Sequence, residues 1–252
     1  MRDFLKWILF FILISSALLL VLCTESNNMI IVNENDLNQQ TFKSTSSDSL
    51  DLPEFVDVNY IELDKIHRIS KFRSGEGHDY SDDFESCRSM KHYFQPDSSI
   101  DWSTIKIFSP VAGTVVRLYE EWAGTQIQIQ SSKHPEFTFI IFHVNLLNPL
   151  HEGDVLTEGQ QLGTHIGSQT MSDIAVGYNT SEGYRLVSYF HIMTDALLLS
   201  YKARGIDSRY DFIISKEARD ADPLECNGES FSTSGTLENW VTLNSGYTGI
   251  VM

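Results

Sequence analysis

A histidine and an aspartate four residues apart are the first residues in the chain whose types suggest chemistry. His78 and Asp82 lie in the segment FRSGEGHDYSDDFESC, which is too rich in Gly, Ser and Asp for the interior of a helix. Imidazole and carboxylate groups are both zinc ligands. The spacing alone also fits ordinary solvated turn residues, so the metal interpretation depends on the rest of the chain.

Two more histidines lie in apolar runs. His143 is part of FIIFHVNL, and His191 is part of YFHIM. An imidazole with a pKa near neutrality can exchange a proton with a metal-bound water or hydrogen-bond a developing negative charge. The same positions also suit a core histidine or a strand histidine that faces solvent, and the local sequence leaves these alternatives open.

The segments that must position these residues have the sequence pattern of β-strands. The runs IKIFSPVAGTVVRLYE, TQIQIQSS and FTFIIFHV are rich in β-branched and aromatic residues, and the Gly-rich stretch HEGDVLTEGQQLGTHIG follows them. Helix signals are few, and the best of them begins at Thr194 in TDALLLSYKARG. We therefore expect a mainly β fold, a compact antiparallel β-sandwich or barrel-sandwich, with an N-terminal hydrophobic helix and few other helices.

The order of these segments resembles the lysostaphin-type zinc metallopeptidases, which are peptidoglycan endopeptidases with a duplicated-hybrid-motif β-fold. The resemblance covers about residues 75–195 and rests on GHDYSD, SPVAGTVV, GTQIQIQ, FIIFHVNL, HEGDVLTEGQQLGTHIG and LVSYFHIM. It implies that His78, Asp82 and His191 hold Zn²⁺. Two imidazoles and one carboxylate are a common ligand set for catalytic zinc, which keeps its fourth position open for water. By the same resemblance, His143 orients the attacking water or stabilises the oxyanion.

One position departs from the family pattern. Tyr189 stands where the resemblance places the first histidine of an H-x-H strand. A phenol can donate a hydrogen bond to an oxyanion, but its pKa near 10 makes it a poor base at neutral pH. The sequence therefore predicts a zinc metallopeptidase that hydrolyses cell-wall or surface peptides with metal-activated water, with His143 and Tyr189 as catalytic residues. The alternatives are a catalytically impaired, metal-binding relative that serves as a binding module or regulator of a cell-wall hydrolase, and a structural domain without metal.

The flanking segments predict a location outside the cytoplasm. Arg2 and Lys6 precede an uncharged apolar run, WILFFILISSALLLVLC, that ends at residue 23, so we interpret 1–23 as a signal peptide or an uncleaved membrane anchor. We further expect a polar linker over 24–52, the metallopeptidase-like β domain over 53–211, and an acidic, Gly- and Ser-rich C-terminal extension over 212–252.

Cysteine content and charge limit the partners. In an oxidising compartment Cys87 and Cys226 could form a disulfide, and two unpaired thiols are the alternative. The formal net charge of -16 argues against nucleic acid as a partner, because phosphate binding needs a concentrated basic surface. A peptide or peptidoglycan substrate is the expected partner, together with the membrane if the N-terminal segment is not cleaved.

Overall fold

The β-branched and alternating runs of the sequence form one large antiparallel sheet. The computed structural model describes residues 50–245, so the expected hydrophobic helix of 1–23 and most of the 24–52 linker lie outside the described residues. The sheet strands are β1 (Ile66–Ser70), β2 (His92–Pro96), β3 (Lys106–Phe108), β4 (Gly113–Glu120), β5 (Thr125–Ser131), β6 (Phe137–Leu146), β7 (Val155–Leu156), β8 (Gln161–His165), β9 (Ser172–Thr180), β10 (Gly183–Val187) and β13 (Trp240–Thr242).

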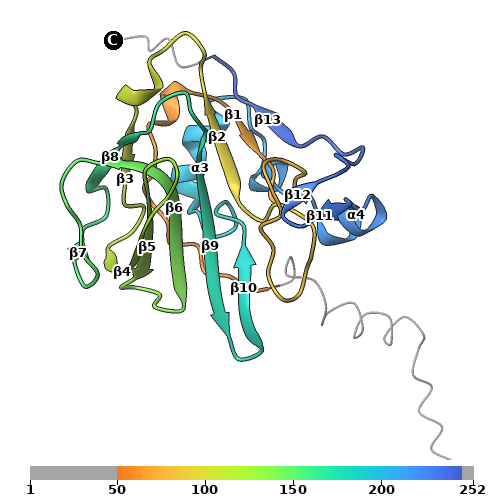
Figure 1. The fold of residues 1–252 in the computed structure, drawn as a ribbon, viewed down its shortest axis with the longest axis horizontal. Helices are drawn as coiled ribbons and strands as arrows, with labels where there is room; N and C mark the ends of the chain where they lie inside the picture. The colour runs from red at the N-terminus through yellow and green to blue at the C-terminus, as the bar shows by residue number, and fades with distance from the viewer. Residues whose placement is uncertain (1–49, 246–252) are drawn as a thin grey trace, which may run out of the picture. The chain divides into compact units, whose positions relative to one another are not determined.

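The strand order places the longest strands at the centre of the sheet. Neighbouring strands follow the order β13-β1-β2-β9-β6-β5-β4-β7, while β10 pairs with β9, and β8 pairs with both β3 and β6 (Figure 1). The pairings between these strands are antiparallel. A separate short hairpin joins β11 (Cys226–Asn227) to β12 (Ser230–Phe231).

Helices are few in the described part of the chain, as the sequence predicts. It contains the α-helices α3 (Asp195–Lys202) and α4 (Lys216–Ala221), and the 3-10 turns η2 (Leu63–Lys65), η3 (Trp102–Thr104) and η4 (Arg209–Phe212). The side chain of Thr194 caps α3 by accepting a hydrogen bond from the backbone N–H of Leu197. The mainly β, antiparallel fold class is therefore confirmed. Between residues 50 and 245, no helix is long and apolar enough to cross a membrane.

Side-chain alternation divides the central strands between two apolar clusters. In β6, Phe139 and Ile141 belong to the main core, whereas Ile140 and Phe142 belong to a smaller cluster on the opposite face. The smaller cluster consists of Phe72, Met90, Ile140, Phe142, Ala175 and Leu186. This second face carries the buried charges described below.

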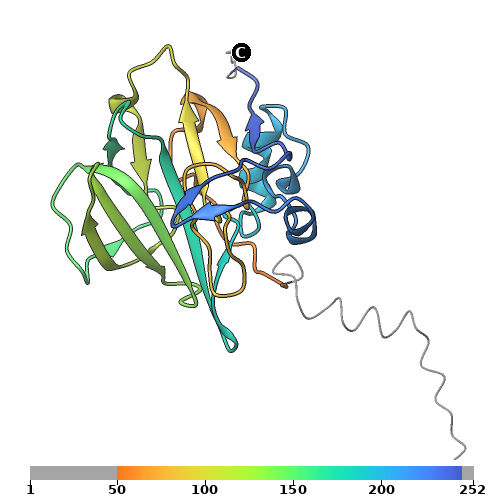
Figure 2. The same cartoon turned by 45° about the vertical axis from the view of Figure 1, so that its right-hand side comes forward.

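The residues after 211, expected to be an appended extension, contribute to the sheet. Strand β13 pairs with β1 in the register Ile69 to Val241, and Cys226 forms a disulfide with Cys87. Figure 2 shows the segment that contains β11 and β12 beside the loop before β2. Of the two alternatives for these cysteines, a disulfide or two free thiols, the structure contains the disulfide.

The segment expected to be an H-x-H strand does not form a strand. Strand β10 ends at Val187, and residues 189–191 form a turn in which the backbone N–H of His191 donates to the carbonyl of Ser188. The run YFHIM suggested a strand because it is apolar and because the resemblance places an H-x-H strand there, but here the chain turns toward α3. The expectation of a strand at this position was therefore wrong.

Candidate functional site

A lysine and an aspartate form an ion pair in the interior of the domain. Lys91 immediately precedes β2, and Asp173 lies in the neighbouring strand β9, opposite Tyr93. Lys91 Nζ is 2.6 Å from Asp173 Oδ2, and the side chains are 2% and 0% exposed. Burying an isolated charge is costly, so each group depends on the other for compensation.

Aromatic rings surround the Lys91 ammonium on its other sides. Nζ lies 4.1 Å from the ring centroid of Phe142, 4.9 Å from that of Tyr80 and 5.0 Å from that of Tyr93. Burial by itself lowers the pKa of Lys91, but the charge of Asp173 and further interactions outweigh it, and the net pKa is raised. The ammonium is therefore a stable positive charge within an aromatic enclosure.

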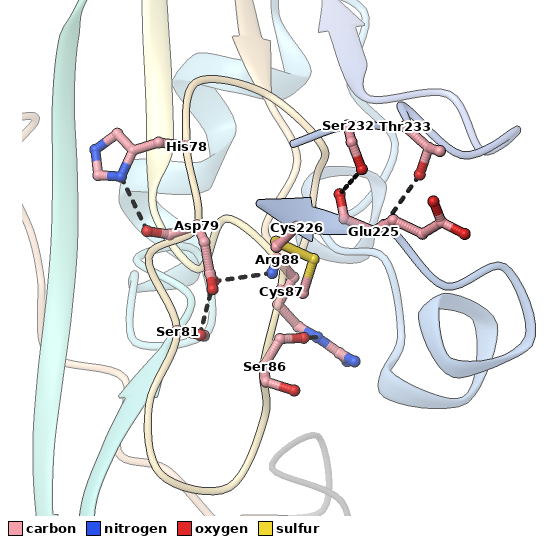
Figure 3. Close-up of a disulfide and its surroundings, with 10 residues drawn as sticks. All are labelled: His78, Asp79, Ser81, Ser86, Cys87, Arg88, Glu225, Cys226, Ser232 and Thr233. Atoms are coloured by element: carbon pink, nitrogen blue, oxygen red, sulfur yellow. Dashed lines mark hydrogen bonds between the residues drawn. A yellow bond between two sulfur atoms is a disulfide. The ribbon is translucent and has the colours of Figure 1, made fainter. Parts of the chain in front are cut away.

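His78 lies against the same ammonium. Its Nε2 is 3.2 Å from Lys91 Nζ, and its Nδ1 is 2.9 Å from the backbone carbonyl oxygen of Asp79, a contact drawn in Figure 3. A carbonyl only accepts hydrogen bonds, so Nδ1 carries the hydrogen and Nε2 presents its lone pair to the ammonium. Figure 3 also shows the Asp79 carboxylate accepting from Ser81 and from the backbone N–H of Arg88, which holds this loop in place.

A β-bulge brings His143 to the other side of Asp173. Opposite Gln126 of β5, strand β6 has two residues, Phe142 and His143, and His143 adopts a positive φ of 60°. The extra residue changes the alternation of β6 at this point, so that Val144 returns to the main core. His143 Nε2 then lies 3.6 Å from Asp173 Oδ1.

Acidic groups determine the charge of His143. Its Nδ1 is 3.0 Å from the carbonyl oxygen of Ala123 and 3.1 Å from Glu121 Oε2. Burial lowers the pKa of His143, but the Glu121 carboxylate and the charge of Asp173 outweigh this, so the net pKa is above its ordinary value. The imidazole therefore favours its cationic form more than a free histidine does.

An exposed tryptophan connects this centre to the surface. Trp122 lies in the turn between β4 and β5 and is 76% exposed, and its ring centroid is 5.7 Å from that of His143. An aromatic side chain that exposed is unusual in a soluble domain, and it offers a planar contact surface. His143 itself is only partly accessible, with 11% of its side chain exposed.

The structure does not bring the three expected zinc ligands together. Both carboxylate oxygens of Asp82 accept hydrogen bonds from backbone N–H groups. Oδ1 accepts from Phe84 and Glu85, and Oδ2 accepts from Leu186. Among residues 50–245, no three His, Cys, Asp or Glu side chains form a group that could hold a metal ion. The residues His78, Asp82 and His191, as placed here, do not fit the zinc site that the resemblance implies.

His191 lies in a different environment from His78. Its ring centroid is 5.8 Å from that of Tyr210, and its backbone carbonyl accepts from Arg209. His191 lines a surface hollow together with residues 50–52, Glu54, Arg209 and Tyr210.

Tyr189, expected to stabilise an oxyanion, is a core residue. It is 0% exposed, and its hydroxyl donates to the carbonyl of Val58 at 3.1 Å. Its ring packs edge-on against Tyr60 and Phe190, and burial raises its pKa. A phenol in this environment does not meet a substrate, so the assignment of Tyr189 as a catalytic residue is not supported.

Sequence reasoning found His78 and His143 but missed Lys91 and Asp173. Both missed residues interrupt apolar surroundings, in SMKHYF and SDIAV. Two opposite charges in separate buried strands are a signal for an ion pair, because neither charge is stable alone in a core. Using this signal also requires knowing that β2 and β9 are neighbours.

The comparisons with known proteins give distant matches in structure alone. No protein family profile and no curated relative matches the chain. A solved structure of a putative glycyl-glycine endopeptidase lytM from Ruminococcus gnavus is similar with 15% identity and a TM-score of 0.32, over 40% of this chain and 43% of that chain. The SpoIIQ-SpoIIIAH pore-forming complex contains a chain with 10% identity and a TM-score of 0.35, over 56% of this chain and 89% of that chain. The chain thus spans less than half of the endopeptidase chain.

Proposed function

We propose that this protein is an extracytoplasmic, lysostaphin-like β domain that binds peptide or peptidoglycan without hydrolysing it. The observation that carries the proposal is the buried Lys91 ammonium, which lies 2.6 Å from Asp173 and 3.2 Å from His78. A hydrolase of the type that the sequence suggests needs a metal-bound water among its histidine and carboxylate groups. Here the Lys91 ammonium contacts His78, one of the expected zinc ligands, and the carboxylate of Asp173.

The other residues that were expected to bind zinc or to take part in catalysis also have structural roles in this chain. Asp82 holds a loop to β10 through Leu186, and Tyr189 supports the main core. His143 is held by Ala123 and by the Glu121 carboxylate. These contacts give the side chains positioning and stabilising roles within the fold.

The surface next to His143 supports a binding role. Trp122 is exposed beside His143. A planar aromatic group can contact the apolar parts of a peptide. The Cys87–Cys226 disulfide supports placement in an oxidising compartment, in agreement with the apolar run near the N-terminus.

Co-sedimentation with purified peptidoglycan, combined with mass spectrometry of the supernatant, tests this function. We expect the full chain to sediment with the insoluble polymer and to release no soluble peptides, with or without added Zn²⁺. Trp122→Ala should reduce the sedimented fraction by roughly tenfold or more, as expected for the loss of a central aromatic contact.

A matched control separates a specific effect from a general loss of exposed aromatic surface. Tyr210 is 65% exposed and packs near His191, so Tyr210→Ala removes an exposed ring that is not part of the turn of Trp122 and should leave sedimentation unchanged. Release of peptides by the wild-type chain, abolished by a chelator or by His143→Ala, would establish a hydrolase and contradict the proposal.

A further inference from the structure

Three potential metal ligands lie at the Lys91–Asp173 ion pair, and one of them is Asp173 itself. Nζ is 2.6 Å from Asp173 Oδ2 and 3.2 Å from His78 Nε2, and Asp173 Oδ1 is 3.6 Å from His143 Nε2. Of these three potential ligands, only His78 was in the ligand set expected from the sequence. The Lys91–Asp173 ion pair is therefore flanked by two imidazoles, His78 at the ammonium and His143 at the carboxylate, although these groups do not form a metal-binding group as they stand in residues 50–245.

Both imidazoles are oriented as metal-binding histidines usually are. His78 Nδ1 lies 2.9 Å from the Asp79 carbonyl, and His143 Nδ1 lies 3.0 Å from the Ala123 carbonyl. Figure 3 shows the first of these contacts, with the His78 ring directed away from the disulfide. Metal-ligating histidines typically donate one ring N–H to a carbonyl or carboxylate, which fixes the tautomer and directs the other nitrogen to the metal.

The ammonium and a metal ion exclude each other at this position. A zinc ion needs its nitrogen and oxygen ligands at about 2.0–2.2 Å, and Lys91 Nζ already contacts two of the three groups. A dication next to this ammonium would also meet strong repulsion, because the Lys91 side chain is only 2% exposed. The lysine therefore supplies the positive charge that Asp173 requires.

We infer that the Lys91 ammonium takes the place of a divalent metal ion, and that removing it converts the centre into a metal site made by His78, His143 and Asp173. This inference concerns the same centre as the proposed function, but it does not depend on peptide binding. Nitrogen and carboxylate ligands together suit Zn²⁺ and Co²⁺.

Thermal unfolding of Lys91→Ala with and without metal tests the inference. The variant leaves Asp173 uncompensated and should unfold at a lower temperature than the wild type in metal-free buffer. Added Zn²⁺ or Co²⁺ should raise the midpoint of the variant, because a ligand that binds only the folded state stabilises it. The wild-type midpoint should not move, and Co²⁺ should give the visible absorption of a bound ion with the variant alone.

Two further variants identify the ligands. Lys91→Ala combined with His78→Ala should bind Co²⁺ at least about tenfold more weakly than Lys91→Ala, since one ligand of the set is lost. Lys91→Arg retains the positive charge and should bind no Co²⁺.

Several outcomes would overturn the inference. These are a Lys91→Ala protein that folds without gaining Co²⁺ binding, one that stays unfolded even when refolded with metal, and a wild type that binds Co²⁺ as tightly as the variant. Peptide release by the wild type would instead contradict the proposed function, so the two failures can be distinguished.

Discussion

At the scale of single residues, the ion pair between Lys91 and Asp173 determines the chemistry of the centre. It fixes a positive charge beside His78 and holds a carboxylate next to His143. The sequence allowed the two histidines to be selected, because each stands out in its segment. It did not allow their partner to be selected, because Lys91 and Asp173 are far apart in the chain and meet only through the register of β2 and β9.

A double-mutant cycle measures how strongly the two charges depend on each other. Lys91→Met leaves a buried carboxylate without compensation and should lower the free energy of unfolding by roughly 3–5 kcal/mol. Lys91→Met combined with Asp173→Leu removes both charges and should be clearly more stable than the single variant. Urea unfolding of the wild type and the three variants gives the comparison. A double variant as unstable as the sum of both single changes would contradict this account.

The charge of His143 makes part of the stability depend on pH. A histidine in the unfolded chain has a pKa near 6.5, and the pKa of His143 in the folded protein is higher. The stability that the protonated ring contributes is therefore fully present below about pH 6.5, and it is lost as the pH rises through the pKa of the folded protein. Glu121→Gln should lower the pKa of His143. The stability difference between wild type and this variant should be largest near pH 6 and should shrink toward pH 8.5.

Nuclear magnetic resonance titration of the His143 ring, with urea unfolding at each pH, checks this prediction. Glu120→Gln is the matched control, because Glu120 neighbours Glu121 but its carboxylate lies near Thr125. An unchanged His143 pKa in Glu121→Gln would show that Glu121 does not set the charge of the ring.

At the scale of elements, turns and a bulge decide which side chains reach the centre. The alternation of TQIQIQ correctly predicted β5, and the β-branched runs correctly predicted β4 and β6. Alternation could not predict the bulge at Phe142 and His143, because a bulge depends on pairing with β5. The strand expected at YFHIM came from its apolar character and from the resemblance, and it was wrong because buried apolar residues occur in turns as well as in strands.

The disulfide should stabilise the segment that contains the β11–β12 hairpin and α4. Cys87 and Cys226 are separated by 139 residues in sequence, so the bond closes a long loop in the unfolded chain. Replacing both cysteines by serine should lower the free energy of unfolding by roughly 2–5 kcal/mol. Limited proteolysis should then cut between α4 and β13 much faster than in the wild type. Equal cleavage rates would mean that the ion pairs around Arg88 and Asp220 hold this segment without the disulfide.

At the scale of the whole molecule, the folded unit is larger than the domain expected from the sequence. The net charge of -16 disfavours nucleic acid, and the sheet is completed by β13, from the region expected to be an extension. Composition and periodicity were sufficient for the mainly β fold. They could not show that residues after 211 join the sheet, because the short strand β13 has no clear alternating pattern in its sequence.

The zinc content of the purified full chain is the most direct test of the central claim, that a lysine ammonium stands where hydrolysis would need a metal. The chain should be equilibrated with excess Zn²⁺, separated from unbound metal, and analysed for zinc per polypeptide beside Lys91→Ala. The account predicts far less than one zinc per wild-type chain and about one per variant chain. One zinc per folded wild-type chain, lost in Asp82→Ala or His191→Ala, would contradict it and restore the ligand set expected from the sequence.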